Sequence, residues 1–279
     1  MKLYTFERNG QLRVGKEHNG QLVDVTSVAP TMLALVQGGD AALNAVRDAQ
    51  GAAYSFDSVR VRAPIRPGKI LCSGVNYRGH GEENPNAKMP ESPFFFSKVP
   101  SAVIGPNDPI ICPPISRQVD YEVEFAVVIG RAINWKTPES QIMSHIFGYT
   151  ILHDVSARDV QFKDNQITLG KNFDSFAPLG PCIVTAGEIP DPASVKLRTT
   201  LNGEVMQDSS NQDWLFPLPK LIGALAQVMT LEPGDIVSTG TPAGVGYFKQ
   251  PQVFLKPGDR VVLEIEGIGR LENPVIAAS

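Results

Sequence analysis

The sequence predicts an α+β fold that consists mostly of β-strands. The 279 residues include 25 glycines and 23 prolines without a stretch of low complexity, and this content of turn-forming residues is typical of a β-rich protein. Segments with strand patterns outnumber segments with helical patterns, and the two kinds do not alternate along the chain. Because a doubly wound parallel sheet requires that alternation, we exclude this architecture.

The N-terminal part is expected to form a small α+β domain. Asn-Gly pairs at residues 9–10 and 19–20 predict hairpin turns between short alternating runs. Two short helical patterns follow within residues 31–49. A stretch rich in proline then has the composition of a linker, so we assign residues 1–66 to one domain and residues 67–279 to a second.

The second domain is expected to begin with a short buried strand at residues 69–72. Strand-forming residues predict further strands at residues 148–152, 236–238 and 260–265. Residues 218–229 carry apolar side chains on one face at helical spacing, which predicts an amphipathic helix. The chain contains no internal repeat.

Residues 119–130 show an alternation with an acidic face. The odd positions are apolar and strand-forming, whereas the even positions begin with Asp120, Glu122 and Glu124. A period of two places these acids on one face of a strand, where they repel one another. A hard divalent cation such as Mg²⁺ or Mn²⁺ would remove this repulsion, because such ions prefer oxygen ligands. The alternative is an edge strand with a solvated acidic face.

Composition and charge exclude several classes of protein. The formal net charge is −4 and the isoelectric point is about 5.6, with neither a basic stripe for nucleic acid nor a polybasic run for a membrane surface. No apolar run approaches the roughly 20 residues of a membrane span, and the N-terminus lacks the apolar core of a signal peptide. Cys72, Cys112 and Cys182 are far apart without CxxC spacing, which argues against disulfides and a zinc site. We therefore expect a soluble, cytoplasmic protein.

Four segments, in chain order, resemble the fumarylacetoacetate hydrolase family. They are Asn76-Tyr77-Arg78-Gly79-His80-Gly81-Glu82-Glu83; Asp120-Tyr121-Glu122-Val123-Glu124; Asp154-Val155-Ser156-Ala157-Arg158-Asp159; and Gly170-Lys171-Asn172-Phe173-Asp174 together with Thr239-Gly240-Thr241-Pro242-Ala243-Gly244-Val245-Gly246. Their order and spacing match the catalytic domain of the family over residues 67–279, and residues 1–66 resemble the small N-terminal domain of longer bacterial members. The resemblance implies a mixed β-sandwich roll, a divalent metal, a homodimer, and chemistry on 2-oxo or β-dicarbonyl acids.

By position, the resemblance implies that Glu122, Glu124 and Asp154 bind one Mg²⁺ or Mn²⁺ in each subunit. Three carboxylates leave about three positions of an octahedral ion for a chelating substrate and a water molecule. Asp120 and Asp159 match no ligand position. They are either acids that support the site or solvated acids.

The resemblance also places two cations beside the metal. Lys171 would bind a substrate oxygen and balance the carboxylates, whereas Arg158 would orient an acidic ligand or contact the substrate. The alternative for both is an ordinary surface salt bridge, worth about 0–1 kcal/mol. Lys98, Gln161 and Thr241 match polar positions of the substrate pocket.

His80 and Glu83 are three residues apart, so on a helical turn they share one face. Glu83 would orient the imidazole, and His80 would move a proton or activate water. The alternative is a solvent-exposed histidine in a loop. Residues 76–93 are polar and rich in glycine and proline, which predicts a mobile lid with the substrate-binding Tyr77 near its hinge. His153 precedes Asp154 and, on a strand, would point away from the site.

The resemblance implies an enzyme that acts on a small-molecule 2-oxo acid. The leading interpretation is hydrolytic cleavage of a C–C bond in an acylpyruvate-like or fumarylpyruvate-like acid through a metal-bound enolate. The alternative at the same site is tautomerisation or decarboxylation of oxaloacetate, or isomerisation of 2-hydroxyhepta-2,4-diene-1,7-dioate from aromatic breakdown. A third class is a non-catalytic, metal-stabilised protein that binds an organic acid. The pair of His80 and Glu83 argues against it, because a binding protein needs no group that transfers protons.

Overall fold

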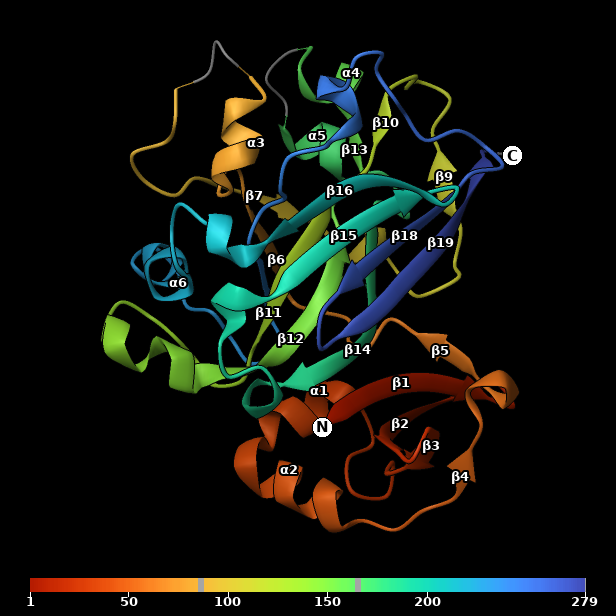
Figure 1. The fold of residues 1–279 in the computed structure, drawn as a ribbon. Helices are drawn as coiled ribbons and strands as arrows, with labels where there is room; N and C mark the ends of the chain where they lie inside the picture. The colour runs from red at the N-terminus through yellow and green to blue at the C-terminus, as the bar shows by residue number, and fades with distance from the viewer. Residues whose placement is uncertain (85–87, 164–166, 279) are drawn as a thin grey trace.

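The computed structural model describes residues 1–84, 88–163 and 167–278, and most of their regular structure is β-strand (Figure 1). The large sheet of these residues has the order β4 (Ala53–Tyr54), β3 (Gln21–Asp24), β2 (Gln11–His18), β1 (Lys2–Arg8), β14 (Ala177–Thr185), β12 (Ile146–His153), β11 (Val123–Ile129), β17 (Ile236–Ser238), β6 (Ile70–Ser73) and β7 (Phe95–Lys98). In addition, β5 (Arg60–Arg62) pairs with β1, and β8 (Val103–Ile104) pairs with β14.

Two smaller sheets complete the strand pairing of the described residues. One has the order β16 (Glu204–Ser210), β15 (Lys196–Leu201), β18 (Arg260–Ile265), β19 (Gly269–Ala277) and β9 (Ile110–Cys112). The other pairs β10 (Val119–Asp120) with β13 (Ser156–Ala157). Parallel and antiparallel pairs both occur in the large sheet and in the five-stranded sheet, so these two sheets are mixed.

The helices are short. The α-helices are α1 (Met32–Gln37), α2 (Gly39–Asp48), α3 (Arg78–Glu82), α4 (Arg158–Gln161), α5 (Ile167–Lys171) and α6 (Leu218–Ala226). The 3₁₀ helices are η1 (Phe56–Ser58), η2 (Pro100–Ala102), η3 (Glu139–His145), η4 (Ala186–Glu188), η5 (Pro192–Ser194), η6 (Asn211–Asp213) and η7 (Gly246–Phe248). None of the helices in the described ranges is long and apolar enough to cross a membrane.

The smaller five-stranded sheet packs against one face of the large sheet and closes the main hydrophobic core. In Figure 1, β15 and β18 lie across β11 and β12, and Phe125, Tyr149 and Leu263 are buried in the core between them. On the other face of the large sheet, Ala126 and Val128 belong to a second buried cluster that includes residues of α1. This arrangement confirms the predicted fold, a mostly β, mixed sandwich of α+β class.

The alternation predicted one continuous strand over the acidic segment, but the structure divides this segment into two strands. The chain leaves the regular strand between β10 and β11, and β10 pairs with β13 instead of continuing in the large sheet. The seven residues of β11 are all buried, because β12 and β17 flank the strand and both of its faces are covered. The alternative of an edge strand with a solvated acidic face is therefore wrong.

The N-terminal part contains the hairpins that the sequence predicted. Asn9 and Gly10 have φ angles of 52° and 74°, and Asn19 and Gly20 have 51° and 74°, which are the left-handed values of a tight hairpin turn. This part joins the large sheet, since β1 pairs with the end of β14. The boundary at residue 66 lies in the connection between β5 and β6 and stays a prediction.

Candidate active site

A cavity of about 270 Å³ collects most of the predicted site residues. Those that line it are His80, Glu122, Glu124, Arg158, Gln161, Lys171 and Thr241. Apolar side chains complete the wall, among them Phe94, Phe96, Phe162 and Phe248. A few polar groups in a mostly apolar cavity are the usual arrangement of a small-molecule site.

Glu122 is held by two buried cations. Nη2 of Arg158 donates to its Oε1 at 2.6 Å, and Nζ of Lys171 donates to its Oε2 at 2.9 Å. Burial alone would raise the pKa of Glu122, but the charges of Lys171 and Arg158 outweigh this effect and hold the pKa below its ordinary value. Because both cations are buried, the alternative of ordinary surface salt bridges is wrong.

Asp154 follows β12 and is also paired twice. Nζ of Lys98 donates to its Oδ1 at 2.6 Å, and Nζ of Lys171 donates to its Oδ2 at 2.7 Å. Lys98 also donates to the backbone oxygens of Val155 and Lys171, so it fixes the chain around the site. Lys171 therefore bridges Glu122 and Asp154, two of the three predicted metal ligands.

Glu124 has no cationic partner among the described residues. Its side chain is 1% exposed and accepts a hydrogen bond of 2.5 Å from the hydroxyl of Ser238. Burial raises the pKa of Glu124 well above its ordinary value, and the neighbouring Asp154 and Glu122 raise it further. A buried carboxylate in this situation is stabilised by a bound cation.

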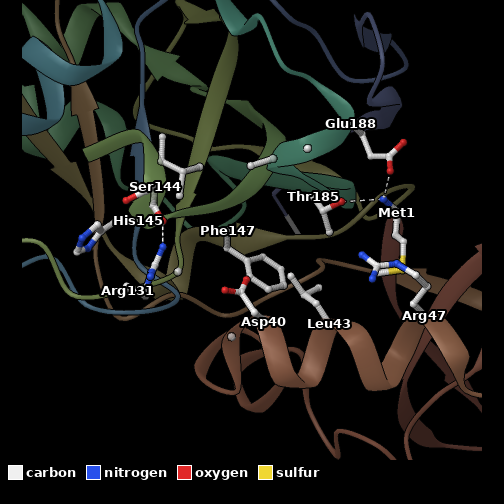
Figure 2. Close-up of a pocket in the computed structure, with 15 residues that line it drawn as sticks. Met1, Asp40, Leu43, Arg47, Arg131, Ser144, His145, Phe147, Thr185 and Glu188 are labelled. Atoms are coloured by element: carbon white, nitrogen blue, oxygen red, sulfur yellow. Dashed lines mark hydrogen bonds and ion pairs between the residues drawn. The ribbon is translucent and has the colours of Figure 1, made fainter. Parts of the chain in front are cut away.

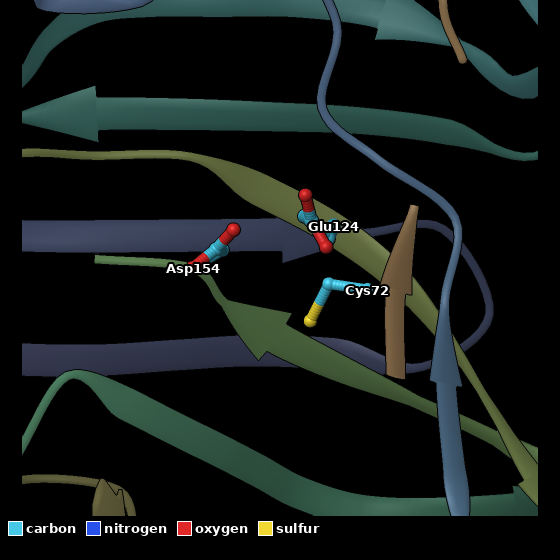
Figure 3. Close-up of side chains that lie close together, drawn as sticks. All are labelled: Cys72, Glu124 and Asp154. Atoms are coloured by element: carbon cyan, nitrogen blue, oxygen red, sulfur yellow. The ribbon is translucent and has the colours of Figure 1, made fainter. Parts of the chain in front are cut away.

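The arrangement of carboxylates fits a divalent cation. Oxygens of Glu124 and Asp154 and the sulfur of Cys72 lie within 4.8 Å of one another (Figure 3). Glu122 lines the same cavity but does not belong to this closest group, and Arg158 and Lys171 hold its two oxygens. The assignment of Glu122, Glu124 and Asp154 as ligands stays a prediction, and Cys72 is a candidate that sequence spacing did not reveal.

Asp120 supports the site and is not a solvated acid. Its carboxylate is fully buried, accepts from Nε of Arg158 at 2.9 Å, and accepts from the backbone N–H groups of Tyr121, Gly246 and Tyr247. It thereby orients Arg158 toward Glu122. Asp159 lies apart from this group and accepts from the hydroxyl of Ser116 and the N–H of Arg117.

His80 and Glu83 form the pair that their spacing predicted. Nδ1 of His80 and Oε2 of Glu83 are 2.7 Å apart, and the two side chains are 13% and 15% exposed, so a freely exposed histidine is excluded. The other oxygen of Glu83 accepts from the N–H of Gly244 at 2.7 Å. Gly244 has a φ of 107°, a conformation that favours glycine. The imidazole ring also packs edge-on against the ring of Phe248, with the two ring centroids 6.1 Å apart.

Tyr77 lies outside the cavity lining, contrary to its predicted role in substrate binding. It is fully buried, its hydroxyl donates to Oδ1 of Asn211 at 2.6 Å, and its ring packs against Trp214. Asn76 is equally buried and bonds to the backbone of Phe216. Both residues anchor the start of α3. Residues 85–87 of the predicted lid lie outside the described residues, and its motion stays a prediction.

Asp213 is a further contact of α3 that the sequence did not reveal. Its Oδ2 accepts from the N–H of Gly79 at 2.8 Å, one residue before His80. The residue that precedes the helix, Tyr77, makes no side-chain capping bond. A carboxylate at the first turn of a helix satisfies a backbone donor and interacts favourably with the helix dipole. Asp213 therefore supplies the missing cap from a distant part of the chain.

Two other polar side chains of the cavity differ in whether they can donate a hydrogen bond to a ligand. Oε1 of Gln161 accepts from Arg158 at 3.2 Å, and within the described ranges no partner is recorded for its amide nitrogen. The hydroxyl of Thr241 donates to the carbonyl of Val123 at 3.0 Å and accepts from Gln207 at 2.9 Å. Gln161 can therefore donate to a ligand, whereas the hydrogen of Thr241 is already used.

His153 is a fully buried residue outside the cavity lining, as the strand alternation predicted. In the described part of the chain, neither ring nitrogen has a hydrogen-bond partner. Burial lowers the pKa of His153 to about 3, and the charge of Lys98 adds to this effect. The imidazole is therefore neutral.

Another cavity, of about 320 Å³, lies between α2 and the end of the large sheet (Figure 2). Asp40 and Arg47 line it from α2, and Arg131 and His145 line it from the opposite side. Arg131 donates to the backbone oxygen of Ser144. None of the predicted site residues reaches this cavity, so it is separate from the carboxylate cluster.

A family model described as the C-terminal domain of fumarylacetoacetate (FAA) hydrolase matches residues 69–276. Among curated proteins, the chain is 44% identical over 269 residues to the mitochondrial oxaloacetate tautomerase FAHD2A of Bos taurus, which covers 93% of this chain and 85% of the relative. Relatives in Rattus norvegicus and Homo sapiens bear the same description. Since all three are named as mitochondrial, the prediction of a cytoplasmic protein is wrong.

Solved structures show similarity over the whole chain. Fumarylacetoacetate hydrolase of Exiguobacterium antarcticum is 37% identical with a TM-score of 0.88, and each chain is covered to 100%. The 2-hydroxyhepta-2,4-diene-1,7-dioate isomerase of Mycobacterium marinum is 33% identical with a TM-score of 0.82, over 100% of this chain and 99% of the other. Maleylpyruvate hydrolase of Sphingobium sp. SYK-6, in complex with manganese(II) and pyruvate, is 29% identical with a TM-score of 0.85, over 100% of both chains.

Proposed function

Because the chain belongs to the fumarylacetoacetate hydrolase family of enzymes, we propose that it interconverts the keto and enol forms of oxaloacetate with the help of Mg²⁺ or Mn²⁺. The observation that carries this proposal is the pair of His80 and Glu83 beside the carboxylate cluster, since tautomerisation needs one group that moves a proton. The name of the relative at 44% identity supports oxaloacetate as the substrate.

Glu122, Glu124 and Asp154 are the proposed ligands of the cation. When bound, a divalent ion polarises a carbonyl oxygen and stabilises negative charge that develops on it. Ser238 orients Glu124, and Arg158 orients Glu122. These contacts hold the ligand oxygens in place on β11 and next to it.

His80 is the proposed acid–base group. Because a carboxylate can only accept, Glu83 keeps a hydrogen on Nδ1 of His80 and leaves Nε2 as the basic nitrogen. In the proposed reaction Nε2 takes a proton from C3 of the keto form and then gives that proton to the oxygen at C2, so that the histidine ends in its starting state. The reverse transfer converts the enol back.

Lys171 and Gln161 are the proposed groups that bind the anionic substrate. Lys171 lines the cavity and contacts two of the proposed ligands, Glu122 and Asp154, and Gln161 lines the same cavity. Arg158 contributes through Glu122 and Gln161 and is committed to both. Thr241 shapes the wall of the cavity.

The second candidate function is hydrolysis of a C–C bond in an acylpyruvate-like acid, the leading interpretation of the sequence. The named activity of the maleylpyruvate hydrolase, at 29% identity, supports it. In that case the same histidine would activate a water molecule. Isomerisation of a hydroxydiene diacid, the named activity of the Mycobacterium marinum protein, needs the same proton transfer without water.

A substrate panel tests these alternatives. Purified protein with Mg²⁺ is mixed with the enol form of oxaloacetate, with an acylpyruvate and with a hydroxydiene diacid, and products are identified by proton NMR. We expect the enol of oxaloacetate to disappear faster than in buffer, without release of pyruvate. Cleavage of the acylpyruvate with no effect on oxaloacetate would replace the tautomerase proposal by the hydrolase.

Asp213 tests whether the position of α3 matters for the reaction. We expect Asp213→Ala to lower kcat by about 10-fold to 100-fold, because small displacements of a catalytic group have effects of this size. Asp213→Asn retains an oxygen acceptor for the N–H of Gly79 and should lose less. Both variants should bind Mg²⁺ like the parent, as measured by calorimetry. Equal kcat in the parent and in Asp213→Ala would show that the cap is dispensable.

The assembly is a separate proposal. The resemblance to the family favours a homodimer, and light scattering coupled to size-exclusion chromatography measures the mass in solution. A monomeric mass across a range of protein concentrations would reject it.

A further inference from the structure

Cys72 is a buried thiol that the proposed reaction does not use. It lies on β6, is fully buried, and in the described ranges has no recorded hydrogen-bond partner. Its sulfur and the carboxylate oxygens of Glu124 and Asp154 lie within 4.8 Å of one another (Figure 3). A thiol in this position adds a sulfur ligand to a group of oxygen ligands.

The three side chains are held in place by the large sheet. Cys72 is on β6, Glu124 is on β11, and Asp154 directly follows β12. The one hydrogen bond recorded for Glu124 uses only one of its oxygens. Both oxygens of Asp154 accept from ammonium groups, Oδ1 from Lys98 and Oδ2 from Lys171, so an incoming ion competes with one of these lysines.

The ligand chemistry distinguishes between cations. Thiolates favour soft or borderline ions such as Cd²⁺ and Zn²⁺, which bind sulfur together with carboxylate oxygen, whereas Mg²⁺ prefers oxygen ligands alone. The spacing of the cysteines argued against zinc, because the motifs that predict zinc sites have ligands close together in sequence. Here the fold brings distant residues together.

Charge balance also favours a thiolate ligand. In the ligand state, where a bound ion replaces the proton that burial favours on Glu124, the four carboxylates Asp120, Glu122, Glu124 and Asp154 stand against the three cations Lys98, Arg158 and Lys171, which leaves one formal negative charge before the ion is counted. A divalent ion alone would change this to one positive charge. If binding also releases the thiol proton to solvent, the group becomes neutral, and a buried group without net charge is the least costly arrangement.

We propose that Cys72, Glu124 and Asp154 form a binding site for a soft divalent cation such as Cd²⁺ or Zn²⁺, with the thiolate of Cys72 as one ligand. The site shares Glu124 and Asp154 with the proposed Mg²⁺ site and uses Cys72 in place of Glu122. A soft ion bound there therefore excludes Mg²⁺, and it inhibits the enzyme by competition. The binding itself does not depend on which reaction the enzyme catalyses.

Titration with Cd²⁺ tests the site directly. Full-length protein is freed of metal by chelation and titrated with Cd²⁺, while the ultraviolet absorption of the cadmium–thiolate bond is recorded. We expect the absorption to rise to one ion per chain in the parent and to be absent in Cys72→Ser. Cys112→Ser is the matched control, since Cys112 lies on β9 outside this cluster, and it should behave like the parent.

Affinities separate a ligand role from a structural one. Loss of a side chain that only orients a metal ligand lowers metal affinity by about 10-fold to 100-fold. Cys72→Ser should therefore lower the affinity for Cd²⁺ by more than this factor. The affinity of the Cys72→Ser variant for Mg²⁺ should change by a few-fold at most. The proposal is overturned if the parent shows no cadmium–thiolate absorption, if Cys72→Ser retains it, or if both affinities fall equally. A Cys72→Ala variant provides the same comparison if the serine variant folds poorly.

Discussion

Removal of divalent cations is expected to abolish turnover, and addition of Mg²⁺ or Mn²⁺ is expected to restore it. The reason is the carboxylate cluster, in which Glu124 is buried without a cationic partner among the described residues. Protein treated with a chelator and passed through a desalting column is assayed before and after addition of each ion. Full turnover in protein shown to be metal-free by elemental analysis would contradict the proposed site.

Glu124→Gln separates the effect on the metal from the effect on the fold. We expect this variant to lose metal binding and turnover, while its metal-free form unfolds at the same temperature as the parent or higher, because a buried carboxylate that lacks a cation is removed. In the parent, metal at 100 times its dissociation constant should add about 2.7 kcal/mol to the free energy of unfolding, and Glu124→Gln should lack this gain. Glu204→Gln, at an exposed position of β16, is the matched control and should retain it.

Local sequence patterns indicated some of the residues that line the cavity, for physical reasons. Strand alternation is a short-range property, and it indicated that Glu122 and Glu124 belong together. The spacing of His80 and Glu83 indicated a shared helical face, and α3 with the residue after it provides that face. Both inferences needed only residues that are close in sequence.

The remaining features depend on contacts between distant residues. Asp213 is 134 residues away from Gly79 in the chain, and no local sequence pattern predicts their hydrogen bond. Cys72 lies near Glu124 because the sheet order places β6 next to β17 and β17 next to β11. This strand order cannot be predicted from local patterns in a single sequence. The sequence did not predict the burial of Tyr77. A tyrosine in a polar segment suggests a binding residue as long as its neighbours in space are unknown.

His80→Ala is expected to lower kcat by about 10²-fold to 10⁴-fold, the usual contribution of a general acid–base group. The expectation depends on the position of His80, which lines the same cavity as Glu122 and Glu124 and holds its Nδ1 against Glu83. The affinity for Mg²⁺ should stay within a few-fold of the parent, because the proposed ligands lie on or beside the large sheet and His80 lies on α3. Rates are measured on the substrate that the panel confirms, and affinity is measured by calorimetry.

Glu83→Gln should reduce kcat less than His80→Ala, because the imidazole remains and only its orientation and charge balance change. His18→Ala is the matched control, since His18 is exposed on β2 and is not part of the cavity lining, and it should turn over like the parent. A ligand that chelates the ion, such as oxalate, should still bind to His80→Ala, because binding requires the carboxylates and Lys171 but no proton transfer. If His80→Ala turns over substrate at nearly the parental rate, another group moves the proton. If His80→Ala is slow and also fails to bind oxalate, the substitution has disturbed the cavity, and the loss of rate does not measure acid–base catalysis.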